Sequence, residues 1–359
     1  MLSKTVVAAL AAASVASAQT FTDCNPLEKT CPSNPAFGKG KVSCSFSSAC
    51  DAIKPVSGTD VKYNSNGAVF AIKTVKQAPT FQSDKYIFFG HVDVEIKPAP
   101  GPGIVTSLVL QSADLDEIDW EWVGFQPNQA QTNYFGRDTQ GTFDRGAFHT
   151  VDGALSTTHK YSIDWTSERI QWLVDDNVVR TLTRAQAGTK YPQTPMQVKI
   201  GSWVAGQPGA PKGTVEWAGG MADFSKAPFE AHYKNLNIVD YGGGSTATTS
   251  EIKEYVYGDK SGSFQSIKVI KADGDSSSSS SSSEKASATS SGAKSTSSAV
   301  STGSRNATTS AASTTLAPSM TSATTSGTAK PTSSNAAMHN AVAAGGVVAA
   351  VAGLLAQLL

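Results

Sequence analysis

Aromatic residues are confined to one part of this 359-residue chain. All 29 of them (14 Phe, 9 Tyr and 6 Trp) lie between Phe21 and Phe264. The stretch from Ser276 to Ser334 instead has 35 Ser or Thr among its 59 residues. Such a segment cannot bury enough apolar surface to offset the entropy lost on folding. The folding part is therefore about 240 residues, which suits one large all-β or α/β domain.

Formal charge is balanced, with 29 Lys and Arg against 29 Asp and Glu. A protein that binds nucleic acid needs a strong basic excess to neutralise phosphates, so that function class is not expected. The sequence also contains no pattern that calls for a cofactor, and none is predicted.

The first 18 residues have the pattern of a secretory signal peptide. Lys4 gives the positive start, Thr5 to Ala13 is an apolar run, and Ala16 to Ala18 is a small-residue cleavage site before Gln19. The alternative is a short buried helix, which the position at the extreme N-terminus disfavours. The mature chain is expected to be secreted.

The C-terminal residues have the pattern of a glycolipid (GPI) attachment signal. Small residues at Asn335 to Ala337 precede a short polar spacer and the apolar tail Ala341 to Leu359. We expect attachment at Asn335 and removal of residues 336–359. The spacer is shorter than usual, so Gly327 and Ser334 remain possible attachment points. The alternative is an ordinary membrane span.

Residues 261–335 are predicted to form a Ser/Thr-rich, mucin-like stalk that carries O-linked sugars. Asn306-Ala307-Thr308 is the only Asn-x-Ser/Thr site for N-glycosylation. The alternative is a flexible linker without sugars. Under either interpretation, this segment holds the folded domain, expected at residues 19–260, at a distance from a surface.

Four cysteines, Cys24, Cys31, Cys44 and Cys50, fall close together near the start of the mature chain. In an oxidising compartment this clustering implies two disulfides. Three pairings are possible, and local closure suggests Cys24–Cys31 and Cys44–Cys50. A zinc site would need Cys-x-x-Cys or His spacing, which the sequence lacks, so no metal is predicted.

Short alternating segments predict a fold built from β-strands. Only the region around Thr183–Ala187 has a helical pattern, and Asp175-Asp176-Asn177 is typical of a hairpin turn. Many short strands indicate two stacked antiparallel sheets, a β-sandwich that can leave an open groove across one face. The predicted strands are Ala68–Val75, Tyr86–Ile96, Ile104–Leu110, Lys160–Trp165, Ile170–Val174, Val178–Leu182, Gln197–Trp203 and Lys234–Val239.

The segment from Asp116 to Trp122 contains the candidate catalytic residues. Side chains alternate on a strand, so Glu117, Asp119 and Glu121 share one face while Ile118 and two Trp share the other. Three adjacent carboxylates repel one another, and a solvated acidic edge would have a polar opposite face. The apolar opposite face therefore indicates a strand inside a sheet, with a functional acidic face.

The spacing of the two glutamates suits a retaining glycosidase. Residues four apart on a strand have Cα atoms about 13 Å apart. Side chains leaning inward on a concave sheet would bring the carboxyls to about 5 Å, the separation of a nucleophile and an acid/base in retaining enzymes. Asp119 between them can support both by hydrogen bonding and by repulsion. This argument does not say which glutamate attacks.

Glu117-Ile-Asp-Trp-Glu121 resembles the Glu-x-Asp-x-Glu signature of glycoside hydrolase family 16, whose fold is a β-jelly-roll sandwich. The chain is most similar to the fungal Crh-type cell-wall transglycosylases of that family. By this resemblance Glu117 is the nucleophile, Asp119 the assisting carboxylate and Glu121 the acid/base, which also contacts substrate. Further matching stretches are Cys24–Leu27, Thr30–Pro32, Asp116–Gly124, Asp144–Gly146, Phe148–His149 and Gly213–Gly220.

The resemblance implies an enzyme that cleaves chitin, a β-1,4-linked N-acetylglucosamine chain, and transfers the glycosyl unit to β-1,3- or β-1,6-glucan. It places the protein in the cell wall and on the outer face of the plasma membrane, with membrane attachment only through the GPI anchor. Some relatives carry a Cys-rich chitin-binding module, for which four cysteines leave no room. The alternatives are an endo-β-glycan hydrolase and a non-catalytic glycan-binding wall protein.

Sugar binding needs flat aromatic platforms with polar groups beside them. Trp203 and Trp217 lie in Gly-rich stretches where the family places sugar contacts, although a single Trp is more often in a core. Trp165 and Trp172 are predicted to be core, and His149 a hydrogen-bonded framework residue. The complete set of predicted substrate contacts is Glu121, Trp203, Gln207, Thr214, Trp217, Tyr134 and Arg137, and a structural role is equally open for Tyr134 and Arg137.

Overall fold

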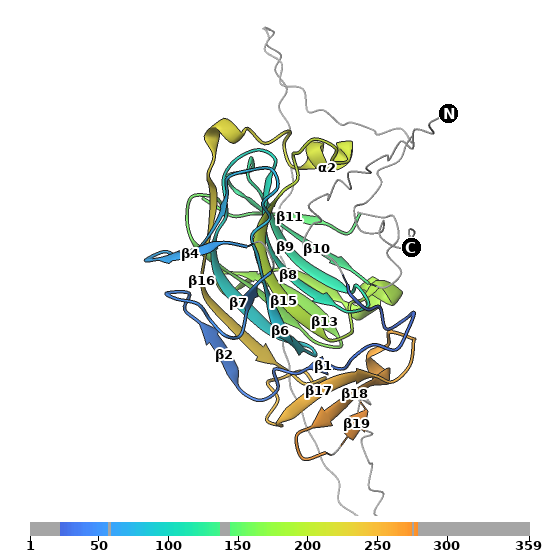
Figure 1. Ribbon diagram of the computed structural model, residues 1–359. Helices are drawn as coiled ribbons and strands as arrows, with labels where there is room; N and C mark the ends of the chain where they lie inside the picture. The colour runs from blue at the N-terminus through green and yellow to red at the C-terminus, as the bar shows by residue number, and fades with distance from the viewer. Residues whose placement is uncertain (1–21, 57–58, 137–143, 275, 279–359) are drawn as a thin grey trace, which may run out of the picture. The chain divides into compact units, whose positions relative to one another are not determined.

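The protein folds into an antiparallel β-sandwich with a small third sheet at one end (Figure 1). The computed structural model describes residues 22–56, 59–136, 144–274 and 276–278. The predicted signal peptide, most of the predicted stalk and the predicted anchor signal lie outside these ranges. Among the described residues, no helix is long and apolar enough to cross a lipid bilayer.

One layer is a seven-stranded sheet that contains the acidic strand, and we call it the carboxylate sheet. Every neighbouring pair of its strands is antiparallel. Its order is β11 (Ala147–Thr150), β10 (Gln129–Phe135), β9 (Glu117–Val123), β8 (Ile104–Ser112), β15 (Met196–Val204), β6 (Thr80–Ile87) and β3 (Lys54–Pro55).

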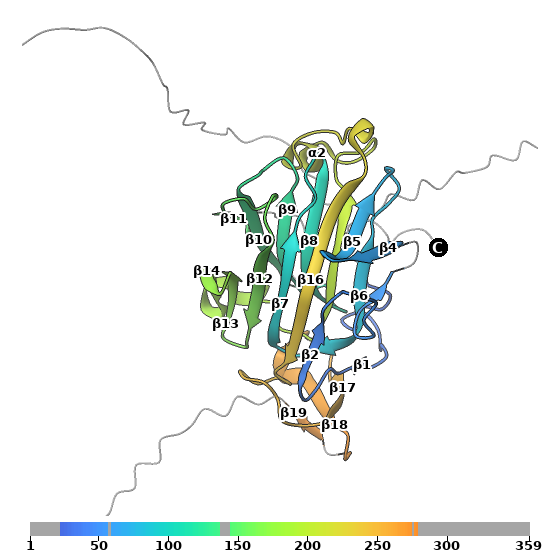
Figure 2. The same cartoon turned by 90° about the vertical axis from the view of Figure 1, so that its left-hand side faces the viewer.

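The second layer, the outer sheet, faces the viewer in Figure 2, where β7 and β16 cross its centre. It is also antiparallel throughout. Its order is β14 (Asn177–Thr183), β13 (Arg169–Val174), β12 (His159–Trp165), β7 (Gly90–Lys97), β16 (Phe229–Asp240), β5 (Gly67–Ile72) and β4 (Val61–Asn64), and β2 (Lys41–Cys44) also pairs with β16.

The third sheet and the helices are short. The third sheet, here the terminal sheet, has the order β1 (Asn34–Pro35), β17 (Ile252–Tyr257), β18 (Ile267–Lys271) and β19 (Ser276–Ser278). The helices are α1 (Arg184–Ala187), α2 (Lys212–Trp217) and the 3₁₀ turns η1 (Gly188–Lys190), η2 (Phe224–Lys226) and η3 (Phe264–Ser266). In both views the terminal sheet and α2 lie at opposite ends of the sandwich.

Indole groups join the two main sheets across the core. Trp120 Nε1 on β9 donates to the Ser162 carbonyl on β12 at 3.0 Å. In the other direction, Trp172 Nε1 on β13 donates to the Asp119 carbonyl on β9 at 3.0 Å. Each bond satisfies a polar ring atom that burial would otherwise leave unpaired. The predicted β-sandwich is confirmed, and Trp165 and Trp172 are fully buried as expected.

The predicted strand Tyr86–Ile96 is wrong as a single element. The chain leaves β6 of the carboxylate sheet at Ile87 and enters β7 of the outer sheet at Gly90. Between them Phe88 and Phe89 are fully buried, and Phe89 has a φ of 56° that ends the extended run. Apolar residues at a corner between two sheets therefore produced the continuous hydrophobic pattern. The other seven predicted strands match observed ones within a few residues.

Thr183–Ala187 is not the only helical segment among the described residues, because α2 is a second one. Its sequence, Lys-Gly-Thr-Val-Glu-Trp, includes a glycine and two β-branched residues, which have low helix propensity. Its formation therefore depends on tertiary contacts. The predicted hairpin turn is confirmed: Asp175 and Asp176 have φ values of 47° and 67° between β13 and β14.

The folded part continues beyond residue 260, so the expected boundary there is too early. Phe264, Ile267 and Val269 are buried in the terminal sheet and its 3₁₀ turn. Asp240, at the end of β16, fastens this sheet to the sandwich. Its carboxylate accepts hydrogen bonds from Tyr255 Oη at 2.5 Å and from the Phe88 amide at 3.0 Å.

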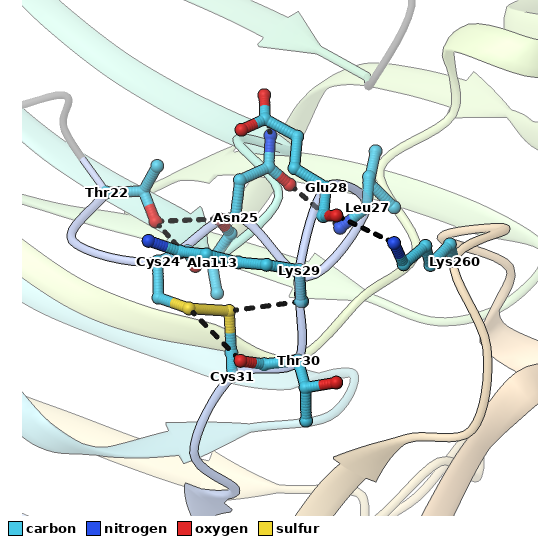
Figure 3. Close-up of a disulfide and its surroundings, with 10 residues drawn as sticks. All are labelled: Thr22, Cys24, Asn25, Leu27, Glu28, Lys29, Thr30, Cys31, Ala113 and Lys260. Carbon is cyan, nitrogen blue, oxygen red and sulfur yellow. Dashed lines mark hydrogen bonds between the residues drawn. A yellow bond between two sulfur atoms is a disulfide. The ribbon is translucent and has the colours of Figure 1, made fainter. Parts of the chain in front are cut away.

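Both suggested disulfides, Cys24–Cys31 and Cys44–Cys50, are present in the structure. Figure 3 shows the first of them closing a loop, here the disulfide loop, that covers residues 24–31. Thr22 Oγ1 donates to the Ala113 carbonyl at 2.8 Å, which fixes the start of this loop to the turn before β9. Lys260 Nζ donates to the Glu28 carbonyl at 2.7 Å and holds its other side.

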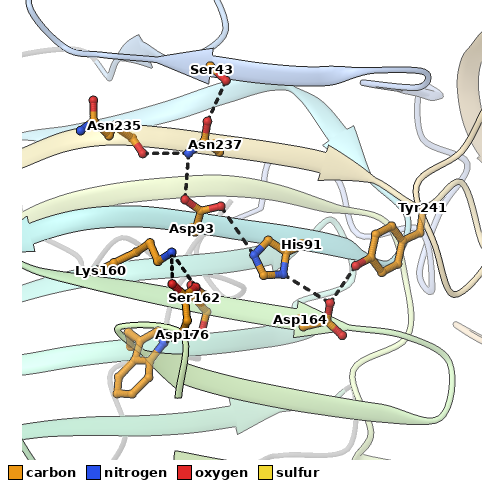
Figure 4. A network of polar contacts seen from close by, with 11 residues as sticks. Ser43, His91, Asp93, Lys160, Ser162, Asp164, Asp176, Asn235, Asn237 and Tyr241 are labelled. Atoms are coloured by element: carbon orange, nitrogen blue, oxygen red, sulfur yellow. Dashed lines mark hydrogen bonds and ion pairs between the residues drawn. The ribbon is translucent and has the colours of Figure 1, made fainter. Parts of the chain in front are cut away.

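The outer face of the sandwich carries a polar network around His91 (Figure 4). Its ring nitrogens lie 3.3 Å from Asp164 and 3.5 Å from Asp93, which sit on β12 and β7. These two carboxylates raise the pKa of His91 to about 9 despite its partial burial. Tyr241 Oη also donates to Asp164 at 2.7 Å, and Asn237 Nδ2 to Asp93 at 2.8 Å. The network therefore ties three strands of the outer sheet together.

Candidate active site

The acidic face of β9 is built as the alternation predicts. Ile118, Trp120 and Trp122 are fully buried in the core between the sheets. Glu117 and Asp119 project from the opposite face yet are only 8% and 2% exposed. Strands β8 and β10 flank β9 on both sides, so the carboxylates lie within a sheet and not at its edge.

Glu117 is held by a side chain on the neighbouring strand. Gln111, directly opposite on β8, donates from Nε2 to Glu117 Oε2 at 2.9 Å. Lys199 on β15 in turn donates from Nζ to Gln111 Oε1 at 2.5 Å. This relay fixes the amide of Gln111 with its NH₂ group toward the carboxylate. It therefore orients Glu117 and favours its charged form.

Burial of Lys199 lowers the pKa of its ammonium group to about 8, and the negative charge of Glu117 acts in the opposite direction. The side chain is 1% exposed. A buried cation next to a buried anion is stabilised only by such pairing. Lys199 is thus a positively charged part of the site at neutral pH, close to its point of deprotonation.

Asp119 lies between the two glutamates on the same face of β9. Burial raises its pKa well above the usual range, and the charges of Glu117 and Glu121 raise it further, together with a hydrogen bond shared with Glu117. Its Oδ1 atom has no hydrogen-bond partner within the described residues. Burial and the negative charge of Glu117 therefore favour the protonated form of Asp119, which supports Glu117 as a hydrogen-bond donor.

Glu121 has the properties of a proton donor at neutral pH. Burial raises its pKa to about 8, and the negative charge of Glu117 contributes in the same direction. The two glutamates therefore differ in protonation. The Gln111 amide favours the charged form of Glu117, and burial keeps Glu121 protonated. Pairs of carboxyls whose pKa values are pushed apart are the arrangement that acid/base chemistry on sugars requires.

Strand pairing extends the site along one row of residues that crosses the sheet through Glu121. Gln131 on β10 lies opposite Glu121, and Phe148 on the edge strand β11 lies opposite Gln131. On the other side of β9, Ser107 lies opposite Glu121 and Gly201 opposite Ser107. These small residues leave space above the sheet beside Glu121, and the opposite end of this row carries an aromatic ring.

The two tryptophans predicted to bind sugar come together on the acidic face. Trp203 on β15 and Trp217 at the end of α2 have ring centroids 6.2 Å apart, with planes inclined by 28°. Trp217 Nε1 donates to Gln131 Oε1 at 2.8 Å, which brings it next to the row of Glu121. Both rings are half-buried, so part of each remains available for contact.

The other predicted contacts have different outcomes. Gln207 and Thr214 are half-buried near the same end, and Gln207 Nε2 donates to the Val204 carbonyl at 3.0 Å. Tyr134 is wrong as a groove residue, because it pairs with Ile118 on the core face of the sheet and is 7% exposed. Its place in the pairing register, which the sequence does not show, decides this. Arg137, Asn306 and Asn335 lie outside the described residues.

His149 belongs to the framework, as expected. Its Nε2 lies 2.9 Å from Thr132 Oγ1, and its ring packs edge-on against Trp120 with centroids 5.7 Å apart. Burial lowers the pKa of its imidazole, and the charge of Arg180 lowers it further. The ring therefore remains neutral and supports the core face of β9.

Sequence reasoning missed three groups of this site. Gln111 and Lys199 hold Glu117 from neighbouring strands, and only the register between those strands identifies them. Phe148 is 64% exposed, on the same face as the carboxylates. The sequence around Phe148 does not distinguish an exposed aromatic side chain from a buried one, so the pattern alone does not identify Phe148 as part of the site.

Comparison with known proteins agrees with this architecture. A model of the glycosyl hydrolases family 16 matches residues 51–219. Crh-like protein 4 of Aspergillus fumigatus is 46% identical over 258 residues, which are 72% of this chain and 55% of that protein. Crh-like protein 3 of the same species is 45% identical over 267 residues, 73% of this chain and 71% of that protein. The chain thus spans about half the length of the first relative.

A solved structure has the same fold at close sequence similarity. A Crh5 transglycosylase in complex with NAG is 44% identical, with a TM-score of 0.64, and the match covers 68% of this chain and 99% of that one. The same protein without ligand gives a TM-score of 0.63. The acidic strand, the sandwich around it and these similarities lead to one assignment: the chain belongs to glycosyl hydrolases family 16, among the Crh-like proteins.

Proposed function

We propose that this protein is a retaining transglycosylase that cleaves chitin and transfers the released chain to β-glucan in a fungal cell wall. The observation that carries the proposal is the difference in protonation between the two glutamates on β9: Gln111 holds Glu117 in its charged form, and Glu121, which is half-buried, has a pKa of about 8. The similarity to a Crh5 transglycosylase in complex with NAG supports an N-acetylglucosamine chain as donor.

In the first step the Glu117 carboxylate attacks the anomeric carbon while the bond to the leaving oxygen breaks. Glu121 gives its proton to that oxygen, so the leaving chain departs as a neutral alcohol. Asp119 donates a hydrogen bond to Glu117 and limits the repulsion between the glutamates. The product is a glycosyl ester on Glu117, and Glu121 is left as a carboxylate.

In the second step a hydroxyl of the acceptor glucan attacks the anomeric carbon of this ester. Glu121 removes the hydroxyl proton, the ester bond breaks, and both glutamates return to their starting states. Water can attack in the same way, which gives hydrolysis. Transfer predominates only if the acceptor is bound and oriented, since positioning can supply effective concentrations of about 10⁵ M or more.

The acceptor side is inferred from the direction of attack. The leaving oxygen departs from the side of the anomeric carbon opposite Glu117, toward Glu121. The exposed aromatic surface lies at that end of the site, with Trp217 bonded to Gln131 and Phe148 in the same row. Aromatic faces of this kind stack on pyranose rings. We therefore place the acceptor over Trp217 and Phe148.

The cellular location of the protein is also a proposal. A signal peptide at 1–18, O-linked sugars and one N-linked sugar at Asn306 on the stalk, and a GPI anchor at Asn335 would hold the enzyme outside the plasma membrane and in the wall. The supporting observations are the two disulfides, which are typical of secreted proteins, and the composition of the stalk.

Glu117→Gln and Glu121→Gln are each expected to lower donor cleavage by at least about 100-fold, because an amide can neither attack nor transfer a proton. The measurement is turnover of chitin oligomers, with circular dichroism as a check on folding. Asp119→Asn is expected to have a smaller effect because its role is support. Near-normal activity in a folded Glu117→Gln or Glu121→Gln protein would refute the assignment.

The pH dependence follows from Glu121. Its raised pKa keeps the carboxyl protonated below about 8, so kcat/KM for donor cleavage should fall as pH rises through about 8. Lys199 loses its proton in the same range. A Lys199→Met variant distinguishes the two titrating groups. The alkaline limb of the pH profile, the fall in kcat/KM above about pH 8, remains if Glu121 causes it and disappears if Lys199 does. Loss of the limb in this variant would contradict the role given to Glu121.

Trp217→Ala is expected to lower transfer to oligosaccharide acceptors about 10-fold and donor cleavage much less, because the variant removes one stacking surface for the acceptor. Transfer product, hydrolysis product and melting temperature should be measured together. Trp217→Phe, which keeps a ring but loses the bond to Gln131, is the matched control and should retain more transfer. Equal loss of both products would place Trp217 on the donor side, and a lower melting temperature with an unchanged ratio would make it a core residue.

Deletion of residues 335–359 is expected to release the protein into the medium, because the proposed anchor signal is lost. Immunoblots of medium and cell surface measure the distribution, and transglycosylase activity in the medium verifies that the released domain is folded. Normal surface retention of the truncated protein would contradict the anchor proposal.

A further inference from the structure

The turn between β8 and β9 immediately precedes Glu117, and it is short. The Ser112 amide donates to the Asp116 carbonyl at 2.9 Å, and the Asp116 amide donates to Ser112 Oγ at 2.9 Å. Leu115 has a φ of 67°, a left-handed conformation that is uncommon for a residue with a bulky side chain. Such a backbone persists only where its surroundings hold it. The position of Glu117 therefore depends on the contacts that hold this turn.

Two carboxyl groups in the turn are buried and share one partner. Asp114 and Asp116 are 2% and 1% exposed. Thr194 Oγ1 lies 2.5 Å from Asp114 Oδ1 and 2.9 Å from Asp116 Oδ2. The Gln193 amide also donates to Asp116 Oδ2 at 2.7 Å. Residues 193 and 194 lie just before β15, so these bonds fasten the turn to the strand that carries Lys199.

The shared hydroxyl group limits the charge of this pair. A hydroxyl group has one hydrogen, so Thr194 bonds to both carboxyls only when one of them carries a proton. Burial raises the pKa of Asp114, although the hydroxyl groups that bond to it act in the opposite direction. Burial thus favours a proton on Asp114, which removes the repulsion between two adjacent buried charges. With that proton in place, the bridge through Thr194 holds the two carboxyls together.

The terminal sheet reaches the same turn through Tyr257, the last residue of β17. Tyr257 Oη donates to Asp114 Oδ1 at 3.0 Å. A second contact comes from η3, where the Phe264 amide donates to Gln193 Oε1 at 3.3 Å. The terminal sheet is therefore bonded both to the turn before β9 and to the segment that holds this turn.

We propose that the terminal sheet is part of the catalytic unit and that Tyr257 is a positioning residue for Glu117. The Tyr257 hydroxyl holds Asp114. Thr194 joins this carboxyl to that of Asp116, which adjoins Glu117 in the chain. The inference rests on the proposed function, because it concerns the attack by Glu117 on the donor. Small movements matter in such a step, since a displacement of about 1 Å can lower a rate about 100-fold.

Tyr257→Phe removes only the hydroxyl group that holds Asp114. We expect kcat for cleavage of chitin oligomers to fall about 3- to 10-fold with KM unchanged, because the turn moves and the sugar-binding surface does not. Tyr255→Phe is the matched control. Tyr255 lies on the same strand and donates to another buried carboxylate, that of Asp240 on β16 of the outer sheet. Its replacement should lower the melting temperature and leave kcat unchanged.

Thr194 tests the bridge from the carboxylate sheet. Thr194→Val replaces the hydroxyl group by a methyl group of similar size, and it should lower kcat as Tyr257→Phe does. Thr194→Ser keeps the hydroxyl group but loses a buried methyl group, so it should lower the melting temperature and retain near-normal kcat. A kcat that follows the hydroxyl group and not the stability is the mark of positioning. This pair decides the matter if Tyr257→Phe does not fold.

Amide hydrogen exchange gives a measurement that needs no substrate. Exchange over residues 112–117 should become faster in Tyr257→Phe and not in Tyr255→Phe. An unchanged kcat in folded Tyr257→Phe or Thr194→Val protein, or an equal loss of kcat in Tyr255→Phe, would overturn the inference. If the wild-type protein cleaves no chitin oligomer, the proposed donor is wrong, and exchange decides the positioning role separately. Faster exchange of the turn in Tyr257→Phe alone then supports that role, and unchanged exchange refutes it.

Discussion

Three carboxyl groups on one face of a buried strand repel one another, and the rest of the structure accommodates that repulsion. The strand cannot move away from it, because Trp120 and Trp122 are packed on its other face and Trp172 bonds to its backbone. The repulsion is therefore relieved by protons and not by displacement. Two of the three groups, Asp119 and Glu121, have raised pKa values, and the charge remains on Glu117. The packing of the core thus determines the protonation of the site.

The antiparallel register then determines which groups meet the carboxylates. Gln111 lies opposite Glu117 and Gln131 opposite Glu121, so one glutamate acquires a hydrogen-bond donor and the other a link to the aromatic end of the site. A shift of one residue in either neighbouring strand would exchange these polar groups for core residues. The difference in chemistry between the two ends of β9 is therefore a property of strand pairing as much as of β9 itself.

The sequence was most informative where a pattern was local. Alternation over Glu117–Trp122 predicted the buried strand and its acidic face, and clustering of the cysteines suggested the pairing that the structure contains. It was least informative where a partner distant in sequence decides the outcome. Tyr134 faces the core because of its register with Ile118. The helix α2 forms despite poor propensity, and the Tyr86–Ile96 run divides because the chain changes sheets at Phe89.

The position of the terminal sheet has a mechanical consequence. The last described strand, β19, pairs only with β18 at the edge of that sheet, which lies at the opposite end of the sandwich from α2. Tension entering the domain through Ser278 therefore acts first on β19 and β18, and it reaches the main sandwich through contacts that include the Asp240–Tyr255 and Asp114–Tyr257 hydrogen bonds. The terminal sheet therefore lies between the point where such a load enters the domain and β9, the strand that carries the catalytic carboxylates.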